Sequence, residues 1–150
     1  MSDETEFSLA QARSLVAEHI ARVTPEQWTQ LFVIAREALD GEPGEWGGGK
    51  KTEADGRVVM TMPYFHTSKA LSLLVTTLYQ LELIVPFGWM AWSKSRPNAA
   101  EMAEDDDATA VMHLTTSVRR DRFVEGGLAH DVKDKTWSKC FAVLERTHGG

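Results

Sequence analysis

Apolar residues recur every three or four positions in two stretches near the start of the chain. The first covers residues 9–22 and follows Ser8, a residue that favours the cap of a helix. The second covers residues 25–40, where Thr24 is followed by a proline at the first helical position. Gly41 is suited to a left-handed end of the second stretch. The pattern therefore predicts two consecutive helices.

A glycine-rich segment follows these helices. Residues 41–49 hold five glycines and one proline, which favour a turn-rich loop. Residues 57–62 are β-branched and apolar, and the Asp-Gly pair before them is a hairpin turn signal. We therefore expect a two-stranded hairpin whose first arm lies near residues 45–51. Pro63 is expected to end the second arm, because proline lacks the N–H that a strand ladder uses.

The second half of the chain shows helical periodicity again. An apolar face wide enough to require substantial burial follows Ser68. Three consecutive aspartates, Asp105 to Asp107, would complement the positive end of a helix dipole. The predicted helical segments are residues 68–81, a single turn at 89–92, a short helix at 99–104, a helix from the aspartates to about Phe123, and a last helix at 136–146.

Together these elements predict a mainly α fold with a small β-hairpin (α+β), built as a single domain of about five to six helices. A chain of 150 residues is long enough to bury roughly 70% of its unfolded surface. Its 43% apolar and 25% charged residues are typical of a globular domain. We expect a disordered tail at residues 1–7, a helical pair at 8–40 and a body at 44–147.

The sequence favours a cytoplasmic protein that does not cross a membrane. Cys140 is the single cysteine, so no intramolecular disulfide can form. The acidic N-terminus lacks the basic and apolar regions of a secretory signal. Residues 83–92, the longest uncharged apolar stretch, are about half of the roughly 20 residues that a bilayer requires.

Charge is distributed unevenly along the chain. The net charge of −6 argues against broad nucleic-acid binding, which depends on clustered Lys and Arg. Residues 1–45 hold 3 basic and 9 acidic side chains, whereas residues 46–100 hold 6 basic and 3 acidic ones. Residues 119–150 hold 7 basic and 5 acidic side chains. An anionic partner is therefore expected at one of the two basic regions.

Common catalytic and metal-binding motifs are missing or incomplete. Residues 44–50 have the letters of a phosphate-binding loop, but Lys51 stands where a Ser or Thr is needed, and a helix precedes the loop instead of a strand. The five histidines are dispersed, so we expect no metal site and no cofactor. Cys140 lies in an apolar stripe and is expected to be a buried structural thiol.

An arginine-rich cluster is the strongest candidate for chemistry. On a helix, Arg119 and Arg122 would share one face and form a fork for a carboxylate or phosphate, with Phe123 packed inward and Glu125 nearby. Alternatively, these arginines stabilise the negative end of the helix and pair with the acidic first helices. The pattern alone leaves both interpretations open.

Four strings in order along the chain carry a resemblance to a family. They are Glu45-Trp-Gly-Gly, Met62-Pro-Tyr-Phe, Val85-Pro-Phe-Gly-Trp, and the Arg-x-Asp-Arg-Phe-x-Glu-Gly string that begins at Arg119. On these strings, residues 44–144 resemble a family of small bacterial proteins of unknown function. The resemblance implies that the matching segments belong to one architecture, and it implies no activity.

Polar and aromatic residues at the predicted element ends suggest a shallow cleft. Its expected walls are Trp46, Tyr64 and Trp89, and its expected polar groups are Arg119, Arg122 and Glu125.

Three functional hypotheses remain open. The first is a noncatalytic binding module that takes a protein or a small anionic ligand in this cleft. The second is a small enzyme in which Glu125 or Asp121 is the general base and Arg122 clamps an anion. The third is a homodimeric structural or interaction protein whose arginines pair with the acidic helices of a second copy.

Overall fold

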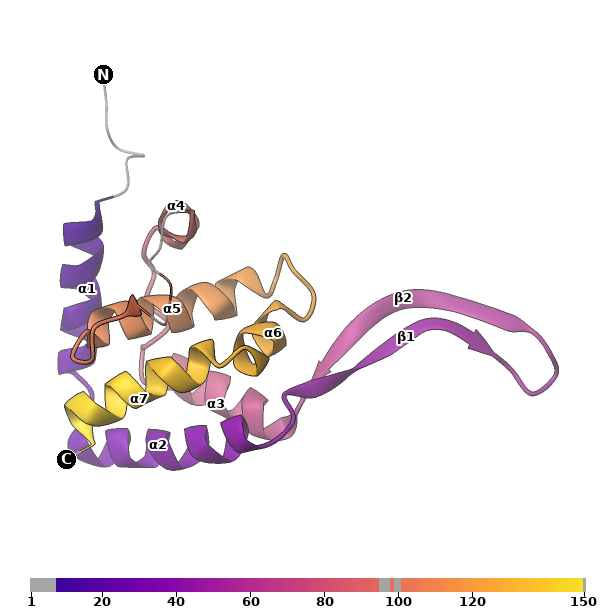
Figure 1. The fold of residues 1–150 in the computed structure, drawn as a ribbon, viewed down its shortest axis with the longest axis horizontal. Coiled ribbons are helices and arrows are strands. Elements are labelled where there is room, and N and C mark those ends of the chain that lie inside the picture. Colours follow the sequence, from indigo (N-terminus) through magenta and orange to yellow (C-terminus); the bar gives the residue numbers. More distant parts are fainter. Residues whose placement is uncertain (1–7, 95–97, 99–100, 150) are drawn as a thin grey trace, which may run out of the picture.

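The described part of the chain forms seven helices, from which a two-stranded antiparallel hairpin extends (Figure 1). The computed structural model describes residues 8–94, 98 and 101–149. The α+β fold class is therefore confirmed. In chain order the elements are α1 (Leu9–Ala21), α2 (Pro25–Asp40), β1 (Gly44–Thr52), β2 (Val58–Thr67), α3 (Lys69–Gln80), α4 (Trp89–Ser93), α5 (Asp107–Arg120), α6 (Gly127–Lys133) and α7 (Thr136–His148).

The starts of α1 and α2 confirm the predicted caps. The Ser8 hydroxyl accepts a hydrogen bond from the backbone N–H of Gln11 at 3.2 Å. At α2, Thr24 and Gln27 form a reciprocal capping box, with bonds of 2.9 and 3.2 Å. The left-handed end predicted at Gly41 is wrong: its φ of −94° and ψ of 178° are extended. The chain leaves α2 directly toward a strand, so no reversal is needed there.

The core is built around α5, which contacts α1, α4, α6 and α7. Every residue from Ala108 to Val118 is buried, as expected for a helix that is covered on all sides. The α2 helix packs against α3 and α7. Cys140 is fully buried in α7, which confirms its interpretation as a structural thiol.

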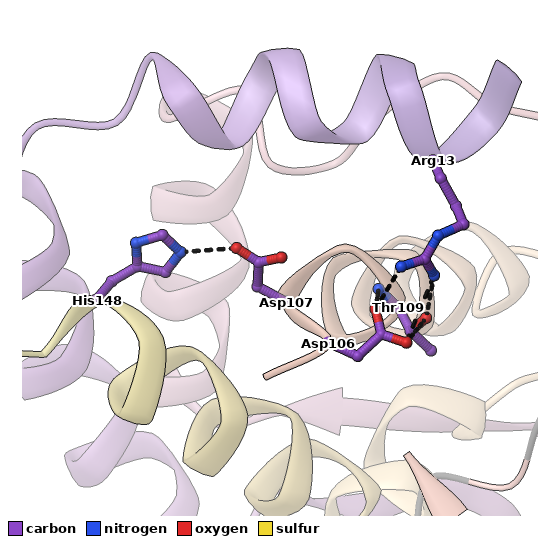
Figure 2. A network of polar contacts seen from close by, with 5 residues as sticks. All are labelled: Arg13, Asp106, Asp107, Thr109 and His148. Atoms are coloured by element: carbon purple, nitrogen blue, oxygen red, sulfur yellow. Dashed lines mark hydrogen bonds and ion pairs between the residues drawn. The ribbon is translucent and has the colours of Figure 1, made fainter. Parts of the chain in front are cut away.

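The aspartate run starts α5, as predicted, and also links this helix to other helices (Figure 2). Asp106 caps α5 through Thr109 and receives hydrogen bonds from Arg13 of α1. Asp107 lies 3.0 Å from His148 Nε2, and the His148 ring stacks on Trp28 with ring centroids 4.2 Å apart. The start of α5 is thereby linked to α1, α2 and α7.

The hairpin is confirmed, although its strands are longer than predicted. The turn between them is closed by the Glu53 N–H, which donates to the Arg57 carbonyl at 2.7 Å. Gly56 supplies the positive φ of 90° that this turn needs. The loop predicted over residues 41–49 is wrong from Gly44 onward, because β1 begins there.

Pro63 does not end β2, which continues to Thr67 and so overturns that expectation. The register pairs Gly47 with Tyr64 and Gly49 with Thr61, so two residues of β2 lie opposite one residue of β1. Pro63 is one of those two residues. A bulge leaves a residue outside the regular ladder, which is why a proline is tolerated there.

The C-terminal third departs from the predicted boundaries. The α5 helix ends at Arg120 instead of Phe123, and the short helix α6 was not predicted. The α7 helix begins at Thr136 as expected and continues two residues past the predicted end, to His148. The tail predicted at residues 1–7 and the first two residues of the helix predicted at 99–104 lie outside the described residues. Among the described helices, none combines the length and apolar character that a bilayer crossing requires.

Candidate functional site

A cavity of about 330 Å³ lies where the root of the hairpin meets the turn between α5 and α6. We call it the root pocket. Strands β1 and β2 supply its aromatic wall, and the end of α5, the following turn and α6 supply its charged groups. Its principal lining residues are Trp46, Phe65, Arg120, Glu125, His130 and Lys133.

The hairpin root is fixed to the α5–α6 turn by two contacts. The Glu125 side chain accepts a hydrogen bond from the backbone N–H of Phe65 at 2.9 Å. The Trp46 ring lies edge-on to Phe65, at 5.5 Å between centroids, and covers Gly126. A Cβ added at Gly126 would lie 2.7 Å from Trp46 Cζ2, and its φ is +76°. Glycine is therefore required at this position by both space and backbone conformation.

The charged lining of the root pocket is predominantly basic. Neither Arg120 nor Lys133 forms an ion pair within the described part of the chain. His130 Nε2 lies 3.7 Å from an Asp134 carboxylate on the surface. Glu125 is the acidic lining residue, and one of its oxygens is already bound to the hairpin backbone. The pocket therefore offers cationic groups to an anion.

Two of the six residues predicted from sequence, Trp46 and Glu125, line the root pocket together. Tyr64 is not among its lining residues. The register pairs Trp46 with Phe65 and Gly47 with Tyr64, and neighbouring pairs point to opposite faces of a hairpin. The Tyr64 ring instead lies against the glycines of β1, where a Cβ on Gly47 would be 2.8 Å from Tyr64 Cζ.

The other three predicted residues lie near the same turn but outside the pocket lining. Trp89 stacks on Phe123, with ring centroids 6.2 Å apart. Phe123 was expected to pack inward and is instead 70% exposed, because α5 ends before it. The helical face expected to join Arg119 and Arg122 is wrong for the same reason: Arg122 follows the helix. Both arginines are exposed.

Sequence reasoning missed Phe65, Arg120, His130 and Lys133 as pocket residues. His130 and Lys133 are three positions apart, a spacing that places them on one helical face once α6 is known. A seven-residue helix that follows two glycines gives little periodicity to detect. His130 and Lys133 were therefore missed because α6 itself was not predicted.

A possible metal-ligand cluster adjoins the pocket. One ligand atom each from His130, Asp131 and Asp134 lie within 4.8 Å of one another. The buried Asp131 carboxylate accepts a hydrogen bond from the Ser117 hydroxyl at 2.5 Å, and Asp134 accepts one from the Thr136 N–H at 3.0 Å. Because the Asp131 carboxylate already joins α6 to α5 and the Asp134 carboxylate already binds the backbone at the start of α7, we assign no metal to the cluster.

Comparison with known proteins places this architecture in a family. No match is found among curated proteins or among solved structures. A family profile described as a family of unknown function (DUF6508) matches residues 23–148. This match begins before the resemblance noted from residue 44 and so includes α2. Because it covers most of the chain, including the hairpin and every residue of the root pocket, the protein belongs to the family of unknown function DUF6508.

Proposed function

We propose that the protein is a noncatalytic binding module that takes a small anionic ligand in the root pocket. The observation that carries the proposal is the presence of Arg120 and Lys133 in one cavity with Trp46. Neither cation has an ion pair within the described residues. Trp46 is 57% exposed although its ring packs edge-on against Phe65.

The dimensions and chemistry of the pocket favour a compact ligand. Its volume of about 330 Å³ is near the lower end of the ligand-site range, roughly 300–1,000 Å³. The planar guanidinium of Arg120 suits two oxygens of a carboxylate or phosphate, and the ammonium of Lys133 adds a second positive charge. Trp46 provides an apolar wall, as tryptophan does at many binding sites.

Binding is favoured over catalysis because the candidate general bases hold the structure together. Glu125 accepts the Phe65 N–H, and Asp121 accepts the Leu128 N–H at 3.0 Å. A base that abstracts a substrate proton needs an oxygen directed at the substrate. In these two residues an oxygen is directed at the backbone.

Arg120→Gln is expected to weaken anion binding at least tenfold, because a hydrogen bond to a charged group contributes about 1.5–3 kcal/mol. The measurement is a thermal-shift titration with inorganic phosphate, pyrophosphate and citrate, followed by calorimetry with the best probe. An anion at 100 times its Kd should stabilise the wild type by about 2.7 kcal/mol.

Arg119→Gln is the matched control, since Arg119 is an exposed neighbour on the same helix and is not a lining residue. Its affinity for the probe should equal that of the wild type. No shift with any of the three anions, or equal losses in the two variants, would overturn the proposal.

A further inference from the structure

The Trp46 indole in the wall of the root pocket is available for stacking. Among the five tryptophans, all of which lie within the described ranges, Trp46 is the exposed one. Phe65 meets it at 80° between the ring planes, so this contact is an edge contact and not a stack. No other ring contact of Trp46 occurs in the described part of the chain. A planar group of a ligand can therefore stack on the indole.

The two cations of the root pocket match a phosphate better than a single carboxylate. Arg120 and Lys133 line the same cavity and each carries a positive charge. A phosphate monoester carries about −1.5 to −2 charges at pH 7 and has three strong acceptor oxygens, so it can accept hydrogen bonds from both side chains at once. A single carboxylate would leave one of the two cations without a matching charge. The anionic end of the ligand is therefore expected to be a phosphate group.

Glu125 gives the same pocket an acceptor for hydroxyl groups. Its Oε1 atom accepts the Phe65 N–H at 2.9 Å, and its Oε2 atom forms no hydrogen bond within the described residues. An ionised carboxylate accepts hydrogen bonds and donates none. The second oxygen would repel another anionic group but suits the hydroxyl of a sugar. The pocket thus holds partners for a phosphate, a sugar hydroxyl and a planar ring.

We propose that the ligand of the root pocket is a mononucleotide. Its phosphate lies against Arg120 and Lys133, its base stacks on Trp46, and a sugar hydroxyl donates to Glu125. This inference rests on the proposed function, because it names the chemical class of the small anionic ligand. A cavity of about 330 Å³, near the lower end of the range for ligand sites, suits one nucleotide better than a dinucleotide.

The base is the part of the ligand that separates this inference from simple anion binding. Stacking of a base on an aromatic side chain contributes roughly fivefold to 150-fold in affinity. AMP and ribose 5-phosphate share the phosphate and the sugar and differ in the base. The ratio of their dissociation constants therefore measures what stacking on Trp46 contributes, because the phosphate contacts are common to both ligands.

The test is isothermal titration calorimetry of the full chain with AMP and with ribose 5-phosphate. AMP should bind the wild type at least fivefold more tightly than ribose 5-phosphate. Trp46→Leu should weaken AMP binding more than ribose 5-phosphate binding, so that the two Kd values come within about twofold of each other. Arg120→Gln should raise both Kd values at least tenfold and leave their ratio unchanged.

Trp89→Leu is the matched control, because it makes the same side-chain change outside the pocket lining. Trp89 is half-buried and stacks on Phe123. Both Kd values of this variant should equal those of the wild type. Circular dichroism establishes that each variant is folded. The comparison of the two ligands in the wild type needs no variant, so it tests the proposal even if Trp46→Leu does not fold.

Three results would overturn the nucleotide while leaving the anion-binding proposal in place. They are equal Kd values for AMP and ribose 5-phosphate in the wild type, equal losses of both ligands in folded Trp46→Leu, and tight binding of phenylacetate. Phenylacetate joins a ring to a single carboxylate and should bind at least tenfold more weakly than AMP. If these ligands fail to bind and phosphate, pyrophosphate and citrate fail as well, both proposals are wrong.

Discussion

Replacing Asp106 by alanine is expected to lower the free energy of unfolding by about 2.5 kcal/mol, of which roughly 1 comes from the lost helix cap and 1.5 from the lost charged hydrogen bonds. Asp106 accepts from the Thr109 N–H at 3.0 Å and the Thr109 hydroxyl at 2.6 Å. Arg13 also donates to it at 2.9 Å (Figure 2). Urea denaturation followed by circular dichroism would measure the loss.

The neighbouring Asp105 supplies the control for this prediction. It is exposed, and no hydrogen bond or ion pair of its side chain occurs within the described residues. Asp105→Ala should therefore change stability by less than about 0.5 kcal/mol. Equal losses for the two variants would contradict the role given to Asp106, because general charge reduction would then explain both.

The contribution of Asp106 is also expected to depend on pH. Burial raises the pKa of the Asp106 carboxyl. The hydrogen bonds from Arg13 and Thr109 lower this pKa by more than burial raises it, so the net pKa is below the ordinary value. A carboxyl whose pKa is lower in the folded state stabilises fully above its unfolded pKa of about 3.9. This stabilisation is lost as the pH falls through the folded value.

The stability difference between the wild type and Asp106→Asn should therefore be largest near pH 7 and shrink below about pH 4. Denaturation at a series of pH values from 7 to 2.5 would measure it, with Asp105→Asn as the reference. A difference that is constant over this range would contradict an ionised, hydrogen-bonded Asp106.

Gly126→Ala is expected to weaken the binding of the best anionic probe and to destabilise the fold by about 2 kcal/mol. About half of this cost comes from placing a side chain at a left-handed φ of +76°. The rest comes from moving Trp46, whose Cζ2 atom would lie 2.7 Å from the new Cβ. The Trp46 side chain would then leave the wall of the root pocket. Calorimetric titration and denaturation would measure the two effects separately.

Gly56→Ala separates backbone strain from displacement of the ring. Gly56 has a φ of +90° at the hairpin turn, but nothing lies within 4 Å of a Cβ built there. The free energy of unfolding of this variant should fall only by the cost of backbone strain, about 1 kcal/mol. Its affinity for the anion should equal that of the wild type. If Gly126→Ala keeps wild-type affinity, the position of Trp46 does not matter to the site.

Much of the fold follows from local sequence signals that agree with the packing. Thr24 and Gln27 cap α2 in the structure because the capping groups are three residues apart in the sequence. The Asp-Gly turn likewise placed the hairpin correctly. The extent of β1 was harder to predict, because Gly47, Gly48 and Gly49 have low strand propensity. Glycine is needed at Gly47 and Gly48 because the Tyr64 ring, on the opposite strand, occupies the space that side chains at these two positions would fill.

The candidate site was only partly predictable for a similar reason. Trp46 and Glu125 meet because Glu125 holds the Phe65 backbone, a contact that spans 60 positions. No periodic pattern carries information about that contact. The sequence did indicate a basic segment there, but the end of α5 decides which arginine enters the pocket. That end lies at Arg120, so the predicted Arg122 lies outside the helix.

The two ends of the β1–β2 hairpin are adjacent, since the Ser68 N–H donates to the Pro43 carbonyl at 2.8 Å. Beyond the root, which Glu125 and Trp46 attach to the α5–α6 turn, the hairpin is therefore a closed link between α2 and α3, whatever the number of residues at its far end. Closing a longer loop costs only slightly more, about 0.6 kcal/mol for each doubling of length. Over evolutionary time the part of the hairpin beyond Trp46 and Phe65 is thus free to lengthen, shorten or change sequence while the helices keep their packing, so its reach can vary independently of the core.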